Sequence, residues 1–234
     1  KHAKLLDVLS VDNTPESAHK FLLKIGYWQA NKNPYPRRHG ILQDERYIHE
    51  IITNDRKDLT HLKCYAIDNS NSNDADDAVS IDGERVWIHI ADVASQVECD
   101  SELDSYAQNR ISNLYLPDQI IHMLPPSLVP IFSLGEDNKS RALSVGFKLI
   151  DSQITDIEVV QSTIKVERLS YENADQILDQ HSELSQLNNL TINHKAFRNA
   201  NGALRLDLPN IDVRLIDEQV SLKKQAVSES REMI

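Results

Sequence analysis

The amino-acid sequence predicts an α+β fold in which helices pack on a mixed or antiparallel sheet, preceded by a small helical module. Segments rich in β-branched residues, which are typical of strands, lie in the middle of the chain. Segments with apolar residues at helical spacing lie before, between and after them. Hydrophobic residues make up 40% of the 234 positions and only 6 residues are Gly. This composition excludes collagen-like and disordered chains and predicts a folded, water-soluble protein.

A small helical module is expected over residues 1–55. Thr14 and Pro15 suit the N-cap and the first turn of a helix, and Gly26 ends it. A second short helical pattern runs over residues 44–52. Because this part of the chain is mildly basic, a packing subdomain and an RNA-contacting module are both open as interpretations.

The next segments predict a strand and a helix. Residues 86–90 are a β-rich run that follows an Asp-Gly turn, which favours a strand. His89 lies within this strand, where a hydrogen-bonded core histidine is favoured over a metal ligand. A capped helix is expected over residues 101–111. Four prolines over residues 117–130 then predict an irregular passage.

The second half of the chain predicts further strands and helices. Apolar residues alternate over 143–149 and β-branched residues are frequent over 154–166, which is consistent with a hairpin. Two helices, a second hairpin and the start of another helix are expected over 170–178, 183–199, 212–222 and the last ten residues.

The formal net charge of −11 disfavours a nucleic-acid partner at first sight, because phosphate binding depends largely on basic side chains. The charge is not evenly distributed, however. Residues 64–110 carry a net charge of −9, and the other 187 residues together carry about −2. The acidity is therefore a local property, and nucleic acid stays open as a partner.

Features of membrane and secreted proteins are absent from the sequence. It contains no apolar run of the roughly 20 residues that a membrane helix requires, and no secretory signal pattern. No membrane partner is expected, and a cytoplasmic location is predicted, or an organelle if a targeting segment has been removed. Cys64 and Cys99 are expected to be free thiols, as is usual in a reducing compartment.

A group of four carboxylates is the strongest functional signal in the sequence. If the fold brings these carboxylates to about 5 Å, each pair costs on the order of 3 kcal/mol at an effective dielectric constant near 20. A converging set therefore requires a cation, and oxygen ligands favour Mg²⁺, Mn²⁺ or Ca²⁺ over zinc. The calcium-loop pattern fails, because Gly and Glu are missing from its sixth and twelfth positions. A solvated turn rich in Asn, Ser and Asp is the alternative. The four residues are Asp68, Asp74, Asp76 and Asp77.

Seven blocks, in order over about residues 56–147, resemble the catalytic domain of the ribonuclease II and ribonuclease R (RNB) family. The blocks are Arg56-Lys57-Asp58-Leu59, Ile67-Asp68, Asp74-Ala75-Asp76-Asp77-Ala78, His89-Ile90-Ala91-Asp92-Val93, Leu103-Asp104, Tyr115-Leu116-Pro117 and Met123-Leu124-Pro125. Weaker matches continue through 202–204 to 229–231. The resemblance implies that residues 56–234 are the first part of such a catalytic domain, incomplete at the C-terminus. The helical front end is similar to that of variant members with a helix-turn-helix or winged-helix-like module.

The resemblance also implies an activity and a set of site residues. Family members are processive 3′-to-5′ exoribonucleases that use Mg²⁺, for which Mn²⁺ can substitute, to hydrolyse single-stranded RNA to 5′-nucleoside monophosphates. All four aspartates match active-site positions. Of these, we expect Asp68 and Asp77 to be direct metal ligands, Asp74 a direct or water-mediated ligand, and Asp76 a substrate or second-metal group. Tyr115 matches a tyrosine that stacks on a base near the 3′ end. The opposite clamp position, which is Phe in several bacterial relatives, falls at Leu206.

Two other functions stay open beside a Mg²⁺-dependent exoribonuclease. One is an RNA-binding family member that holds RNA without cutting it, and the other is a structural cation-binding loop in an unrelated α+β protein. The rest of the catalytic domain and an OB-type RNA-binding domain are expected in the full-length protein. Asp92 and His89 are interpreted as support for the strand and the loop after it, and Asp104 as a helix or loop contact.

Overall fold

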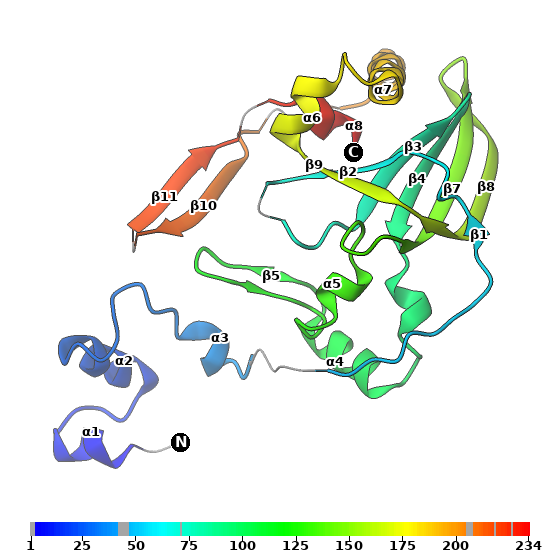
Figure 1. Ribbon diagram of the computed structural model, residues 1–234. Helices are drawn as coiled ribbons and strands as arrows, with labels where there is room; N and C mark the ends of the chain where they lie inside the picture. Colours follow the sequence, from blue (N-terminus) through cyan, green and yellow to red (C-terminus); the bar gives the residue numbers. More distant parts are fainter. Residues whose placement is uncertain (1–2, 42–46, 71, 205–207, 218, 226) are drawn as a thin grey trace. The chain divides into compact units, whose positions relative to one another are not determined.

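The computed structural model confirms the predicted α+β class, with one large sheet, two small ribbons and several helices (Figure 1). The chain divides into two compact units. One contains residues 1–43, 114–121 and 211–223, and the other contains residues 44–113, 122–210 and 224–234. The structure describes residues 3–41, 47–70, 72–204, 208–217, 219–225 and 227–234.

The smaller unit contains short helices and two β-ribbons. Its elements are α1 (Lys4–Val8), α2 (Pro15–Lys24), α3 (Tyr35–Arg38), the β5–β6 ribbon (Leu114–Tyr115 and Ile120–Ile121) and the β10–β11 ribbon (Ile211–Ile216 and Gln219–Lys224). The Thr14 side chain accepts a hydrogen bond from the backbone N–H of Ser17 at 3.1 Å and caps α2. The predicted helix after Thr14 and the predicted hairpin over 212–222 are therefore confirmed.

The helix predicted over residues 44–52 is wrong over 47–52, which are irregular, and residues 44–46 lie outside the described residues. Distant side chains satisfy the backbone of this segment. The N–H of Ile52 donates to Gln96 Oε1 at 3.0 Å, and Gln96 Nε2 donates to the Ile52 carbonyl at 2.9 Å. The N–H of Tyr47 donates to Ser127 Oγ at 3.0 Å. These contacts replace the hydrogen bonds that a helix would supply.

The larger unit is built on a seven-stranded sheet with the strand order β1-β8-β7-β4-β3-β2-β9. The pairs β1–β8 and β2–β9 are parallel, and the other neighbouring strands are antiparallel. The predicted mixed sheet is thus confirmed. The strands are β1 (Lys57–Asp58), β2 (Cys64–Asp68), β3 (Asp77–Asp82), β4 (Arg85–Ala91), β7 (Ser140–Ile150), β8 (Gln153–Ile164) and β9 (Val166–Ser170).

Helices pack on this sheet and complete its hydrophobic core. They are η1 (Val93–Gln96), α4 (Glu102–Arg110), α5 (Val129–Phe132), α6 (Tyr171–Ile177), α7 (Ser182–Ala200) and α8 (Glu229–Met233). Figure 1 shows α6, α7 and α8 next to one another beside β2. Tyr65 and Ile67 of β2 pack with Ala174 and Leu184 of these helices, and all four are buried. Burial of this apolar surface fixes β2 and the strand beside it.

Most predicted elements of the larger unit are confirmed. The strand over 86–90 lies within β4, and the hairpin predicted from 143 to 166 is β7–β8. The helices expected over 101–111, 170–178 and 183–199 are α4, α6 and α7. The irregular passage predicted over 117–130 contains only short elements, namely the two-residue strand β6 and the four-residue helix α5.

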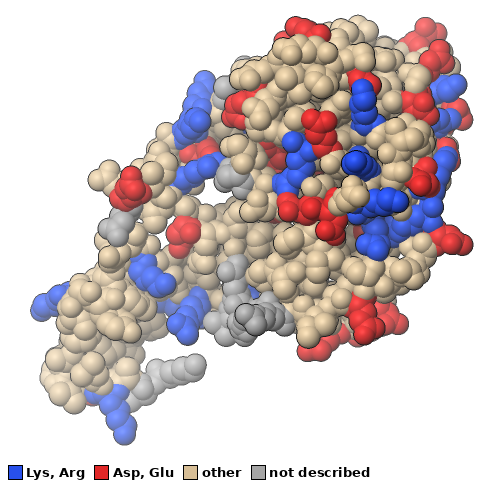
Figure 2. Space-filling model, in the orientation of Figure 1, with Lys and Arg blue, Asp and Glu red and all other residues tan. Residues whose placement is uncertain are grey.

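Charged side chains of both signs lie on the surface of the protein. On the face drawn in Figure 2, acidic side chains lie in several separate places, with Lys and Arg among them.

Cys64 is buried and Cys99 is exposed, and both are free thiols, as expected. Among the described helices, none has both the length and the apolar character that crossing a bilayer would require. The cytoplasmic location stays a prediction.

Candidate active site

The four aspartates lie at one end of two neighbouring antiparallel strands. Asp68 is the last residue of β2, and Asp77 is the first residue of β3. The chain between them is fixed by backbone hydrogen bonds from other elements, because Ala91 N–H donates to the Asp76 carbonyl at 2.7 Å and Leu134 N–H donates to the Ala75 carbonyl at 2.9 Å. The carboxylates are therefore positioned by the rigid sheet rather than by the loop alone.

Asp68 and Asp74 are held by short-range side-chain contacts. Asp68 Oδ1 accepts the backbone N–H of Asn69 at 2.7 Å. Asp74 Oδ1 accepts the Ser72 hydroxyl at 3.0 Å, and its Oδ2 lies 3.9 Å from His122 Nδ1. Asp74 Oδ2 also accepts a hydrogen bond from Asn113 Nδ2 at 3.5 Å.

The electrostatics show that the structure brings the four carboxylates into one neighbourhood. Burial raises the pKa of Asp76, and the charges of Asp74, Asp77 and Asp68 raise it further. Burial also raises the pKa of Asp77, with the charge of Asp68 as the second cause. Such mutual repulsion in a half-buried site is relieved by a bound cation.

The donor set fits Mg²⁺, with a limit on direct coordination. Within the described chain, three ligand atoms within 4.8 Å of one another occur at Cys99, Asp100 and Asp104, and the four aspartates do not form such a set. In this conformation one ion could therefore contact at most two of the four carboxylates directly. Mg²⁺ is usually bound by one or two carboxylates, with water and substrate phosphates completing its shell. The ligand roles of Asp68, Asp74 and Asp77 stay predictions.

Two arginines support the loop that carries the aspartates, and the sequence reasoning missed them as site residues. Arg168 Nη2 donates to the Ser72 carbonyl at 2.5 Å, and its Nη1 pairs with Glu136. Arg231 Nη2 donates to Asn69 Oδ1 at 3.3 Å. Arg231 lies in the weak C-terminal match, which was a signal for the family but not for this contact. Arg168 lay in none of the matching blocks.

Tyr171 is another missed neighbour of the site. The Arg231 Cζ lies 3.8 Å from the centroid of the Tyr171 ring. Burial raises the pKa of Tyr171, as do the charges of Asp68 and Asp77, while Arg231 lowers it. The phenol, the guanidinium and the two carboxylates therefore interact electrostatically.

The two residues predicted to contact bases are Tyr115 and Leu206. Tyr115 lies on β5 in the smaller unit and is 64% exposed, and its stacking role stays a prediction. Leu206 lies outside the described residues.

Asp92, Asp104 and His89 have structural contacts. The Asp92 Oδ2 forms an ion pair with Arg56 Nη2 at 2.8 Å, next to η1. Asp104 Oδ2 accepts hydrogen bonds from the Asp100 N–H and from Gln108 Nε2, both at 2.9 Å, at the start of α4. His89 is 0% exposed and lies between hydroxyls, with Nε2 2.9 Å from Ser80 Oγ and Nδ1 2.6 Å from Ser144 Oγ. Its enclosure excludes it from the reacting groups, in agreement with the predicted core role.

Acid is expected to destabilise the protein through His89. Burial lowers its pKa from 6.5 to about 4, so between these values the unfolded chain binds a proton that the folded chain does not. Stability is retained above pH 6.5 and falls as the pH drops toward 4, by about 3 kcal/mol. Urea unfolding of the wild type and His89→Gln at both pH values measures this. The variant lacks this titrating group, so it should lose less stability than the wild type, and the raised pKa values of Asp76 and Asp77 act in the opposite direction in both proteins. Equal losses would assign the acid sensitivity to other groups.

Comparisons with known proteins identify the family and the fold of this chain. A family model described as the RNB domain matches residues 56–234, and one described as a double HTH domain matches residues 1–34. An uncharacterized ribonuclease of Synechocystis is 30% identical over 261 residues, which cover 100% of this chain and 39% of the relative. The chain thus spans about two fifths of that protein's length.

Solved structures share the fold. Ribonuclease R of Mycoplasma genitalium, in complex with ribose-methylated single-stranded RNA, has a TM-score of 0.70 at 21% identity, covering 95% of this chain and 38% of that one. An active-site mutant of the Dss1 exoribonuclease from Candida glabrata has a TM-score of 0.76 at 22% identity, covering 95% of this chain and 36% of that one. The RNB match extends over most of the chain and begins at the predicted Arg56 block, and residues 1–34 match the double HTH domain. The chain therefore belongs to the RNB family.

Proposed function

We propose that the protein containing this chain is a Mg²⁺-dependent exoribonuclease that degrades single-stranded RNA processively from its 3′ end to 5′-nucleoside monophosphates. The observation that carries the proposal is the electrostatically coupled group of four aspartates at the ends of β2 and β3. Membership of the RNB family supports it, and so does the fold shared with a ribonuclease R bound to single-stranded RNA.

The aspartates have separate positions from which to act. Asp68 and Asp77 end and begin neighbouring strands, so they are the best-fixed holders of a cation. When bound, Mg²⁺ would supply water activation and neutralise charge on the scissile phosphate. Asp76 carries a raised pKa and can accept a hydrogen bond from the substrate. No protein nucleophile is required, and the enclosed His89 does not supply a base.

An RNA-shortening assay with the natural full-length protein tests the proposal. With Mg²⁺, 5′-labelled single-stranded RNA should shorten stepwise without accumulating long intermediates, and 3′-labelled RNA should release its label first as a mononucleotide. A chelator should stop both reactions. Internal fragments would contradict exonucleolytic cleavage. RNA binding without shortening would favour the RNA-holding alternative, and full activity in the chelator would reject the metal role.

A further inference from the structure

The backbone that carries Arg231 is firmly attached to α6. Asp175 Oδ1 accepts the Ser228 hydroxyl at 3.2 Å and the Ser230 N–H at 2.9 Å. The Ser228 hydroxyl in turn accepts the Arg231 N–H at 3.2 Å. Ser228 and Ser230 are buried, and Met233 packs in two core clusters. The start of the Arg231 side chain is therefore fixed relative to β2 and β3.

The Arg231 guanidinium is held by neutral groups. One side stacks on the Tyr171 ring at 3.8 Å, and Nη2 donates to the Asn69 amide oxygen at 3.3 Å. Its Nε is buried and, within the described part of the chain, has no hydrogen-bond partner. Neither of these two contacts is an ion pair, so an anion beside the guanidinium would add a charge-assisted hydrogen bond to the contacts it already has.

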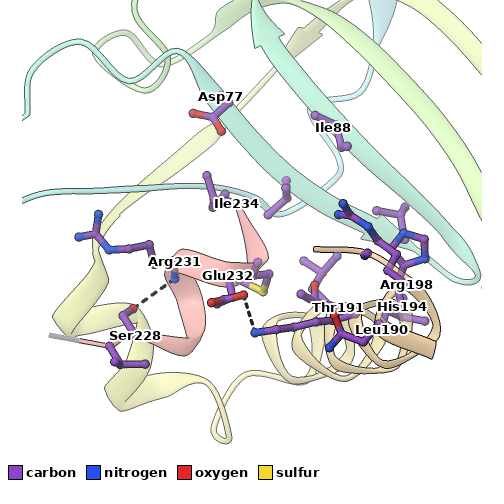
Figure 3. A pocket seen from close by; sticks show the side chains of 18 of the residues that line it. Asp77, Ile88, Leu190, Thr191, His194, Arg198, Ser228, Arg231, Glu232 and Ile234 are labelled. Carbon is purple, nitrogen blue, oxygen red and sulfur yellow. Dashed lines mark hydrogen bonds and ion pairs between the residues drawn. The ribbon is translucent and has the colours of Figure 1, made fainter. Parts of the chain in front are cut away.

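Arg231 and Asp77 are among the residues that line a cavity of about 1070 Å³. In Figure 3, Asp77 and Arg231 lie on the left of this cavity, and His194 and Arg198 lie on its right. This volume lies just above the usual range for small-ligand pockets, roughly 300–1,000 Å³. A strand of RNA that presents its scissile phosphate to the aspartates would therefore bring a neighbouring phosphate to the Arg231 side.

We propose that Arg231 binds a phosphate of the RNA chain close to the 3′ end, next to the phosphate that the aspartates address. This rests on the proposed exoribonuclease function. Tyr171 keeps the guanidinium plane fixed, and Asn69 orients one of its amino groups, so the remaining amino N–H groups can donate to phosphate oxygens. The contact is to the backbone, so it gives affinity and register without reading the base.

Neutral linkages in the RNA test this contact. Single-stranded oligoribonucleotides carry one methylphosphonate linkage, moved one position at a time from the 3′ end, and binding is measured by fluorescence anisotropy in chelator, where no cleavage occurs. For the wild type, one position should weaken binding about tenfold, because a charged hydrogen-bonded contact is lost. Arg231→Gln should bind unmodified RNA about tenfold more weakly and should be insensitive to that same position.

Two further variants keep the result interpretable. Arg231→Lys should keep part of the sensitivity, because it retains the charge but not the planar fork. Arg198→Gln, at the other end of the cavity, should stay sensitive to the position that Arg231→Gln ignores. If Arg231→Gln stays sensitive at every linkage, or both Gln variants respond alike, the inference is overturned. RNA shortening by the wild type in Mg²⁺ is measured separately, so its absence would count against the proposed function and not against the phosphate contact.

Discussion

Asp77→Asn is expected to abolish the shortening of RNA while RNA binding is kept. Asp77 begins β3 and is one of the two best-fixed carboxylates of the site. The amide has the shape of the carboxylate but not its charge, so the cation loses a holder. Since changing groups around metal ligands already costs about 10- to 100-fold, we expect a loss of at least about 100-fold. The rate is measured with 5′-labelled RNA in saturating Mg²⁺, and binding by anisotropy in chelator.

Folding does not account for this loss. The pKa of Asp77 is raised in the folded protein, so its charged form is less favourable there than in the unfolded chain and removal of the charge should not destabilise the fold. Asp82→Asn is the matched control, because Asp82 is the exposed last residue of the same strand. It should leave the rate near that of the wild type. An active Asp77→Asn enzyme, or equal losses in the two variants, would contradict the assignment.

Sequence patterns predicted those helices and strands whose stabilising contacts lie within a few residues of the element itself. The helix after Thr14 depends on a cap three residues away, and the strand over 86–90 follows a tight turn. The β7–β8 hairpin likewise pairs segments that follow each other directly in the chain. Such interactions are readable from sequence because the partners are a few residues apart.

Distant partners explain where sequence reasoning failed. Residues 47–52 have a helical pattern, but contacts with Gln96 and Ser127 decide their conformation. The contact between Arg231 and Asn69 joins residues 162 positions apart, and the contact between Arg168 and Ser72 joins residues 96 apart. Arg168 becomes a site residue through the pairing of β9 with β2, and Arg231 through the packing of α8 beside β2.

The candidate site could be predicted in part because its four aspartates are close together in the sequence. Four aspartates within ten residues must lie near one another if both ends of the segment are strands, and the structure brings them together. Which carboxylate oxygens can share one ion depends on the loop conformation. That conformation is determined by hydrogen bonds to Ala75 and Asp76 from Leu134 and Ala91, which no local pattern encodes.

Arg56→Met is expected to destabilise the folded protein by about 3–5 kcal/mol, because it leaves the carboxylate of Asp92 buried without its counter-ion. The side chains of Arg56 and Asp92 are only 5% and 8% exposed, and their ion pair measures 2.8 Å. Arg56 Nη2 also donates to Ser95 Oγ at 2.7 Å. The free energy of unfolding is measured by urea denaturation at neutral pH.

The double variant Arg56→Met/Asp92→Leu separates the worth of the pair from the cost of an unpaired charge. Replacing both partners by apolar side chains removes the buried charge, so most of the lost stability should return. Lys63→Met is the control for an exposed pair, because Lys63 is 64% exposed where it contacts Glu183, and it should change stability little. A double variant as unstable as Arg56→Met would mean that the lost hydrogen bonds to Ser95 and its neighbours dominate. Recovery would show that the instability of Arg56→Met comes from the unpaired charge of Asp92, and not from loss of the ion pair that joins the first and fourth matching sequence blocks.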